Sequence, residues 1–143
     1  MLHGIDRLLT PDLLHAMAAM GHGDVITIVD ANFPAARCAN RLILTPGVDA
    51  TAMLRAVLSL LPVDDFIPTP LLTMQVVGAP DHVPEAVVSF HQTAASAGID
   101  LGRIKAVERF DFYNIARDSF AIVQTGDCRL YANIAITKGV IAG

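Results

Sequence analysis

The sequence has 143 residues, of which 53% are apolar and 17% are charged, and its formal net charge is −4. This length fits one domain with a core of its own. Without a cluster of Lys and Arg to neutralise phosphates, nucleic acid is not expected as a partner. No apolar stretch reaches the ~20 residues of a membrane span, so no membrane partner is expected, and the N-terminus carries no recognisable signal peptide.

The two cysteines, Cys38 and Cys128, form no metal or redox motif. We interpret them as free thiols and therefore expect a cytoplasmic protein. The apolar fraction exceeds that of an average soluble domain. Part of this excess would be explained by an interface between subunits, since oligomers cover apolar surface that monomers leave wet.

Helical and extended patterns alternate along the chain. Thr10 and Pro11 suit the N-cap and first turn of a helix, and Thr125-Gly126-Asp127 is a turn signal typical of an antiparallel hairpin. The patterns predict, in chain order, a helix from Thr10 to Gly21, strands at 25–29 and 41–45, a helix over 54–61, a strand at 71–77, a helix from Pro84 to Gly98, a strand at 104–107, a helix capped by Asp111 and reaching about Ser119, and strands at 120–124 and 130–136.

This alternation predicts a single α/β domain in which helices cover a largely buried sheet. Ligands of such sheets bind in the crevice beyond the strand ends. Asp30 directly follows the first strand, so it is well placed for function.

A histidine stands between two glycines in Gly21-His22-Gly23-Asp24. Such a turn can project the imidazole from the backbone, where it suits proton transfer near neutral pH, with a nearby carboxylate fixing its tautomer. The alternative is a helix-ending turn with a merely solvated histidine, and the spacing does not decide between the two. No histidine pair supports a metal site at His22, Asp24 and Asp30, so we expect no metal.

Two further clusters carry polar side chains among apolar ones. Arg109 and Tyr113 are four residues apart, hence on one helical face, where they would donate to hydroxyl groups. The alternative, which the residues alone favour, is an aromatic core patch with a surface arginine. Tyr131 and Asn133 alternate along a predicted strand, which predicts a shared polar pocket or, alternatively, a solvent-facing edge.

The ordered set of segments resembles the L-fucose mutarotase and D-ribose pyranase family. Arg-Phe-x-Phe-Tyr and Asn-Phe-Pro are similar to the fucose branch. Ala132 departs from it, because that branch usually has glycine between the tyrosine and the asparagine. We therefore expect an added methyl beside two sugar ligands. The matching segments are residues 14–24 (LHAMAAMGHGD), 30–34, 60–64, 109–113, 120–123, 125–127, 131–134 and 138–140.

The resemblance implies a three-layer α/β/α sandwich with a mixed central sheet. It also implies a homo-oligomer, a pentameric ring or a decamer, with sites at subunit interfaces. Its chemistry would be the exchange of α and β anomers of a free monosaccharide by acid–base ring opening, without metal or organic cofactor. Alternatives are a pyranose–furanose exchange, as in the ribose branch, or a sugar-binding transport accessory without catalysis.

By the same resemblance, His22 is the catalytic histidine. Tyr113, or alternatively Tyr131, is a candidate second proton-transfer group or donor. We expect Asp30 to hold the imidazole or a sugar hydroxyl. The expected substrate-binding residues are Asp30, Asp64, Arg109, Tyr131 and Asn133.

Overall fold

The computed structural model describes residues 1–143. None of its helices is both long and apolar enough to cross a membrane. The elements, in chain order, are α1 (Pro11–Ala19), β1 (Val25–Val29), α2 (Ala35–Cys38), β2 (Leu42–Thr45), α3 (Ala50–Leu58), β3 (Leu71–Met74), α4 (Glu85–Ser96), the short 3₁₀ helix η1 (Leu101–Arg103), β4 (Ile104–Val107), α5 (Arg109–Asp118), β5 (Ala121–Thr125) and β6 (Ile134–Thr137).

The six strands form one mixed sheet in the order β2-β5-β1-β6-β3-β4. Strands β2, β5 and β1 pair in parallel, as do β3 and β4, whereas β6 runs antiparallel to both of its neighbours, β1 and β3. Five strands therefore point the same way, and their carboxyl ends meet at one edge of the sheet. Residues that follow different strands are brought together at this edge.

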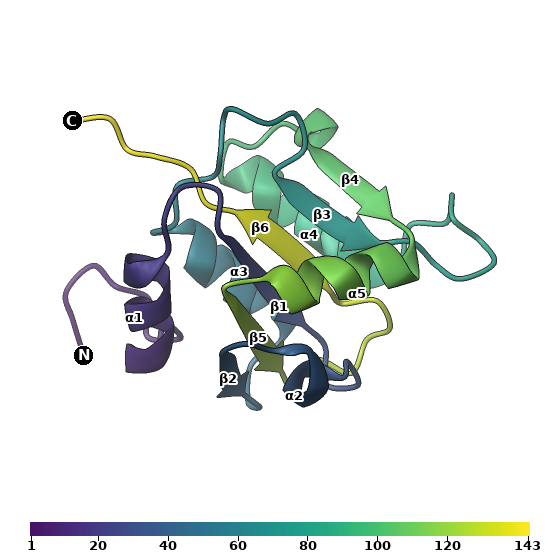
Figure 1. Cartoon of the computed structure of the whole chain (residues 1–143), viewed down its shortest axis with the longest axis horizontal. Helices are drawn as coiled ribbons and strands as arrows, with labels where there is room; N and C mark the ends of the chain where they lie inside the picture. The colour runs from purple at the N-terminus through teal and green to yellow at the C-terminus, as the bar shows by residue number, and fades with distance from the viewer.

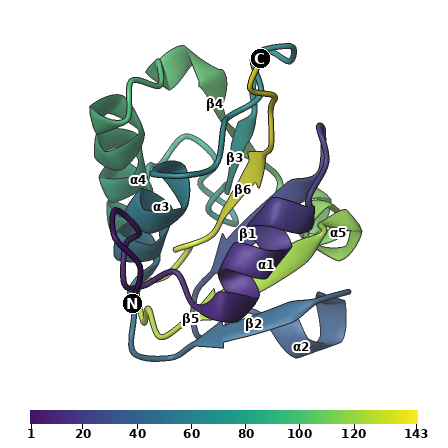
Figure 2. The same cartoon turned by 90° about the vertical axis from the view of Figure 1, so that its left-hand side faces the viewer.

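Helices cover both faces of the sheet (Figures 1 and 2). Alternate residues of β1 point to opposite faces, as the strand period of two requires. Ile26 and Ile28 join a core with α1, α3 and α4, and Val29 joins a second core with α2 and α5. Full burial of each such side chain contributes roughly 1.5–3 kcal/mol. The predicted three-layer α/β/α sandwich with a mixed sheet is confirmed.

The ends of α1 are fixed by side chains. Thr10 Oγ1 accepts a hydrogen bond from the Leu13 main-chain N–H at 3.3 Å, with Pro11 in the first turn. At the other end, Lys138 Nζ donates to the carbonyls of Met17 and Met20 at 2.8 and 2.5 Å. A lysine there satisfies carbonyls that lack a partner in the helix and complements the helix dipole.

The start of α5 differs from the prediction. Asp111 lies in the first turn, and the N-cap is Glu108, whose Oε2 accepts hydrogen bonds from the Phe110 and Asp111 main-chain N–H groups at 2.8 and 3.2 Å. Helix α2 was not predicted, since its four residues are too short for a periodic pattern. The strand predicted over 71–77 ends at Met74.

The predicted hairpin of the last two strands is wrong. β1 lies between β5 and β6, and β6 begins only at Ile134. Thr125-Gly126-Asp127 leaves the sheet edge instead of turning back. Thr125 Oγ1 donates to the Val29 carbonyl at 2.8 Å, and the Gly126 N–H donates to the Val48 carbonyl at 2.9 Å. Residue 126 is glycine because its loop packs closely against the loop that contains Val48, and not because the chain makes a tight turn there.

Gly126→Ala tests this close approach. A Cβ at residue 126 would lie 1.9 Å from the Pro46 carbonyl oxygen, which belongs to the backbone and cannot swing away. We expect a loss of about 1–3 kcal/mol in the free energy of unfolding, measured by urea denaturation. Gly47→Ala is the matched control, because nothing lies within 4 Å of its Cβ position. Equal stability of the two variants would contradict the packing described here.

Candidate active site

A hollow of about 230 Å³ opens where the parallel strands end. Crevices at this edge are the usual ligand sites of α/β sheets. We call it the strand-end hollow. Five of the seven predicted site residues line it. Its lining residues are Asp30, Asn32, Phe33, Met74, Val77, Arg109, Tyr113, Leu130, Tyr131 and Asn133.

Asp30 is the buried carboxylate of the strand-end hollow. Its Oδ1 accepts a hydrogen bond from the Asn32 N–H at 2.9 Å, and its own main-chain N–H donates to Asn133 Oδ1 at 2.9 Å. Burial raises the pKa of Asp30 above its ordinary value, although the hydrogen bonds from the Asn32 and Phe33 N–H groups oppose the rise. A carboxyl group of this kind can exchange a proton closer to neutral pH than a solvated aspartate.

Arg109 and Tyr113 stand one helical turn apart on α5, as predicted. Arg109 Nε donates to the Tyr113 hydroxyl oxygen at 3.1 Å. The Tyr113 ring packs edge-on against Phe33, with ring centroids 5.3 Å apart. Because the hydroxyl oxygen already accepts from arginine, its own proton is free to be donated into the hollow. The core role expected in the alternative interpretation belongs to the neighbouring Phe112, which is buried.

Tyr131 and Asn133 reach the hollow from a loop, so the predicted strand alternation is not the reason for their placement. Tyr131 has a φ of 61°, the only non-glycine residue with a positive φ. Its hydroxyl oxygen accepts from the Val77 N–H at 3.1 Å. Asn133 is buried, and its N–H donates to the Tyr131 carbonyl at 2.8 Å. The two side chains are held by this folded loop.

His22 lies in the predicted glycine turn, before β1. The turn is held by the Gly21 N–H donating to Asp24 Oδ2 at 2.7 Å, and Gly23 has a φ of 86°. His22 Nε2 is 3.1 Å from Asp64 Oδ1; the histidine side chain is 44% exposed, whereas the aspartate is buried. We call these two residues the imidazole pair. Within one chain Asp64, not Asp30, holds the imidazole, so of the two roles expected for Asp30 the contact with a sugar hydroxyl stays a prediction.

Asp64 is placed to accept a hydrogen bond from the imidazole and to remain ionised beside it. The Phe66 N–H donates to the same carboxylate at 3.1 Å, and this bond, with that from His22, holds the pKa of Asp64 below its ordinary value despite burial. With Nε2–H donating to Asp64, Nδ1 becomes the basic nitrogen. A Cβ at Gly139 would lie within 2.9 Å of the Asp64 main-chain nitrogen, so glycine there allows the segment to sit this close.

The imidazole pair and the strand-end hollow lie at opposite edges of the sheet. In the register of β1 with β6, Val25 is opposite Thr137 and Ile28 is opposite Ile134. The Asp64 N–H bonds to the Thr137 carbonyl, whereas Asn133 precedes Ile134. At about 3.3 Å per residue, the five residues of β1 span about 13 Å. One sugar ring cannot contact both groups within one chain.

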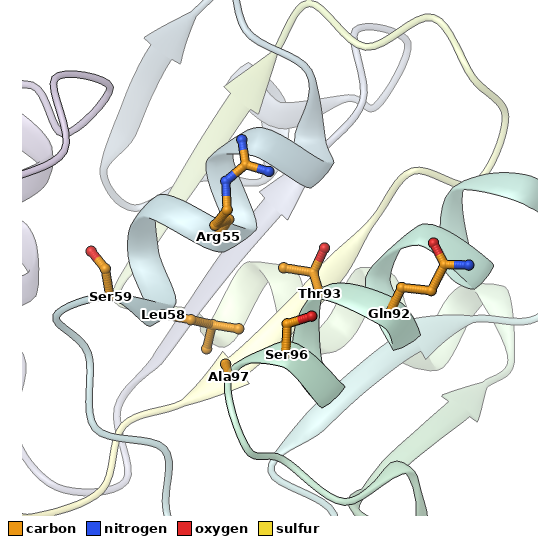
Figure 3. A pocket seen from close by; sticks show the side chains of 7 residues that line it. All are labelled: Arg55, Leu58, Ser59, Gln92, Thr93, Ser96 and Ala97. Carbon is orange, nitrogen blue, oxygen red and sulfur yellow. The ribbon is translucent and has the colours of Figure 1, made fainter.

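Two other hollows contain no carboxylate, imidazole or phenol. A groove of about 340 Å³ between α3 and α4 contains no carboxylate, imidazole or phenol (Figure 3). Its lining residues are Arg55, Leu58, Ser59, Gln92, Thr93, Ser96 and Ala97. A larger, mainly apolar hollow beside α1 has Lys138 as its only charged group. No group of three or more His, Cys, Asp or Glu side chains is arranged to hold a metal ion.

The comparisons with known proteins agree over the whole chain. The model of the RbsD / FucU transport protein family matches residues 3–141. The chain belongs to this family. It is 36% identical to the human fucose mutarotase over 146 residues, covering 99% of this chain and 95% of that protein. The structure of the fucose mutarotase from Streptococcus pneumoniae in complex with L-fucose is 40% identical, with a TM-score of 0.94, and covers 99% of this chain and 100% of that one.

A more distant family structure shares only the fold. RbsD from Bacillus subtilis, complexed with D-ribose, is 21% identical to this chain, with a TM-score of 0.76 and 99% coverage of both chains. The RbsD / FucU fold is therefore kept where most residues differ.

Ala132 was expected to add a methyl group beside two sugar ligands. It is fully buried in the core that contains α1, α3 and α4, and it does not line the strand-end hollow. Its methyl group therefore packs in the core and not in the hollow. Sequence patterns also missed Met74, Val77 and Leu130 as lining residues. The only available signal was that Val77 ends the strand predicted over 71–77.

The raised pKa of Asp30 predicts a pH-dependent cost to stability. The folded protein holds this proton more tightly than the unfolded chain, so the free energy of unfolding falls as pH rises from 3.8 through the folded pKa. Asp30→Asn removes that loss while keeping an acceptor oxygen. We expect the variant to be more stable than the parent at neutral pH, with the difference shrinking toward pH 3.8. Urea unfolding across this range measures it; a difference that does not change with pH would contradict the burial effect.

Proposed function

We propose that this protein is a mutarotase that interconverts the α and β anomers of a free monosaccharide, L-fucose or a related aldose. The observation that carries the proposal is the strand-end hollow itself. It presents a buried carboxyl group, two phenols, a guanidinium and two amides, which together suit a neutral ligand with many hydroxyl groups. The full-length similarity to fucose mutarotases supports the choice of sugar.

The reaction needs only proton movement. A base removes the proton of the anomeric hydroxyl while an acid protonates the ring oxygen, so the carbon–oxygen bond of the ring breaks and an aldehyde forms. The aldehyde rotates about one carbon–carbon bond, and the reverse proton transfers close the other anomer. Positioned acid–base groups typically accelerate such steps ~10²–10⁴-fold.

Each polar residue of the strand-end hollow has a role in this reaction that follows from its chemistry. Asp30 accepts a hydrogen bond from a sugar hydroxyl. Tyr113 is the candidate proton-transfer group, because the Arg109 N–H already occupies its oxygen. Arg109, Tyr131 and Asn133 orient the remaining hydroxyls. His22, backed by Asp64, transfers the second proton.

The separation of His22 from the hollow supports a site completed by a neighbouring copy of the chain. His22 of one copy would face Asp30 of the next, as in a closed ring such as a pentamer, or two rings stacked as a decamer. Exposed apolar side chains flank both halves: Phe66 contacts His22 and is 74% exposed, and Leu130 in the hollow is 71% exposed. Such residues are typical of surfaces that another chain covers.

Cys38 and Cys128 are both free thiols, which supports a cytoplasmic protein.

Anomer exchange by NMR saturation transfer tests the function, with L-fucose, D-ribose and galactose as substrates. His22→Ala should slow the protein-dependent exchange by about 10²–10⁴-fold. His15→Ala is the control, because His15 is exposed on α1 and forms no hydrogen bond. An unchanged rate in His22→Ala would refute the role of histidine. If the parent protein accelerates none of the sugars while still binding one, it is a binder and not an enzyme.

Mixed oligomers test whether the site is shared. His22→Ala and Asp30→Ala should each lose most of the anomer exchange when present alone, since alanine at residue 30 removes the acceptor oxygens that asparagine would keep. After co-refolding in equal amounts, about a quarter of the sites should combine an intact Asp30 from one copy with an intact His22 from its neighbour. We therefore expect exchange activity to return to roughly that fraction of the parent's. If the mixture stays inactive although size-exclusion and mass analysis show mixed oligomers, each chain must supply its own pair.

A further inference from the structure

The loop that carries Tyr131 and Asn133 is anchored, outside the strand-end hollow, by an ion pair between the buried Asp127 and the half-buried Arg129. Asp127 is buried, and its Oδ1 accepts from the Arg129 N–H and Nε at 2.9 and 3.1 Å. Its Oδ2 accepts from an Arg129 terminal nitrogen at 2.7 Å and from the Ala50 N–H at 3.0 Å. Both carboxylate oxygens are thus engaged twice, and this bidentate geometry fixes direction as well as distance.

Arg129 connects this ion pair to two helices. Its terminal nitrogens donate to Thr51 Oγ1 on α3 at 2.8 Å and to Ser89 Oγ on α4 at 3.2 Å. The guanidinium is therefore held from the carboxylate side and from the helix side at once. Only Leu130 separates Arg129 from Tyr131, so the position of the arginine backbone constrains where the tyrosine begins.

Tyr131 needs such a constraint. A φ of 61° is disfavoured for a residue with a Cβ and persists only where surrounding contacts enforce it. On the far side, the Asn133 N–H bond to the Tyr131 carbonyl closes the loop. On the near side, the Asp127–Arg129 pair ties the segment to α3 and α4.

The same segment also fixes the loop of Asp30. The Ala31 N–H donates to the Asp127 carbonyl at 2.9 Å, and Thr125 Oγ1 donates to the Val29 carbonyl at 2.8 Å while accepting from the Asp127 N–H at 3.2 Å. The loop of Asp30 is therefore held by main-chain groups of the same segment whose side chains form the Asp127–Arg129 ion pair.

We propose that Asp127 and Arg129 are positioning residues that hold Tyr131 and Asn133 in the geometry that binds the sugar. The proposal rests on the proposed function for its consequence in catalysis, but the effect on Tyr131 stands by itself. Neither side chain lines the hollow. A buried ion pair is weak evidence for a stabilising role, since its desolvation offsets its attraction. A role in fixing one loop conformation accounts better for so many directed bonds.

Tyr113 and Tyr131 are the only two tyrosines, and both line the hollow. Full-length protein labelled with 3-fluorotyrosine therefore gives two ¹⁹F resonances, assigned with Tyr113→Phe. We expect Arg129→Ala to shift or broaden the Tyr131 resonance and leave that of Tyr113 in place. The dissociation constant for L-fucose, from the same spectra, should rise on the order of tenfold, and anomer exchange should slow by up to about 10²-fold.

Arg129→Lys is the second variant, because it keeps the positive charge beside Asp127 but loses the planar fork. It should fold even if the alanine variant does not, and should still move the Tyr131 resonance. Arg55→Ala is the control, since Arg55 is an exposed arginine on α3 that forms no hydrogen bond to the loop. It should match the parent in both resonances.

The proposal is overturned if a folded Arg129 variant keeps the parent Tyr131 resonance and sugar affinity. It is also overturned if both tyrosine resonances change together in step with a lower melting temperature, which would indicate a general loss of structure. If the parent protein neither binds nor converts a sugar, the proposed function fails, while the ¹⁹F spectra without sugar still decide the positioning role.

Discussion

The length of β1 constrains the rest of the functional arrangement. The strand begins just after His22 and ends just before Asp30, and β6 pairs beside it in the opposite direction. Each end of this strand pair therefore carries its own polar group, Asp64 with the histidine at one end and Asn133 with the aspartate at the other. Since neither loop folds back across the sheet, we propose that a second copy of the chain brings the two ends to one sugar.

Local sequence patterns predict much of the fold. The main wrong prediction, the hairpin of the last two strands, concerns which strands pair over long distances in the sequence. Strong periodicity and caps identified most helices and strands, with boundaries off by a few residues. The hairpin failed because a Thr-Gly-Asp turn signal says nothing about which strand lies next in space. Here β1, about a hundred residues earlier, inserts between β5 and β6. Gly126 does mark a position that requires glycine, but the reason is the Pro46 carbonyl packed against it and not a hairpin turn.

The candidate site was predictable in its residue types but not in its geometry. A histidine between glycines and an aspartate after a strand are local features, so both were found. The partner of His22 is 42 residues away, and no spacing rule links His22 to Asp64 in preference to the closer Asp30. The positive φ of Tyr131 was equally invisible, because it depends on the anchoring of the whole loop. Ala132 is the opposite case. The sequence draws attention to it as a departure from the fucose branch, but its methyl group lies in the core.

The most direct test of the account is a crystal structure of the assembled protein with L-fucose bound. The account predicts the sugar in the strand-end hollow of one copy, hydrogen-bonded to Asp30 and Asn133, with His22 of a neighbouring copy within hydrogen-bonding distance of the anomeric or ring oxygen. A sugar bound in the hollow with every His22 of the assembly remote from it would contradict a shared site. A sugar bound elsewhere, such as the groove between α3 and α4, would contradict the site itself.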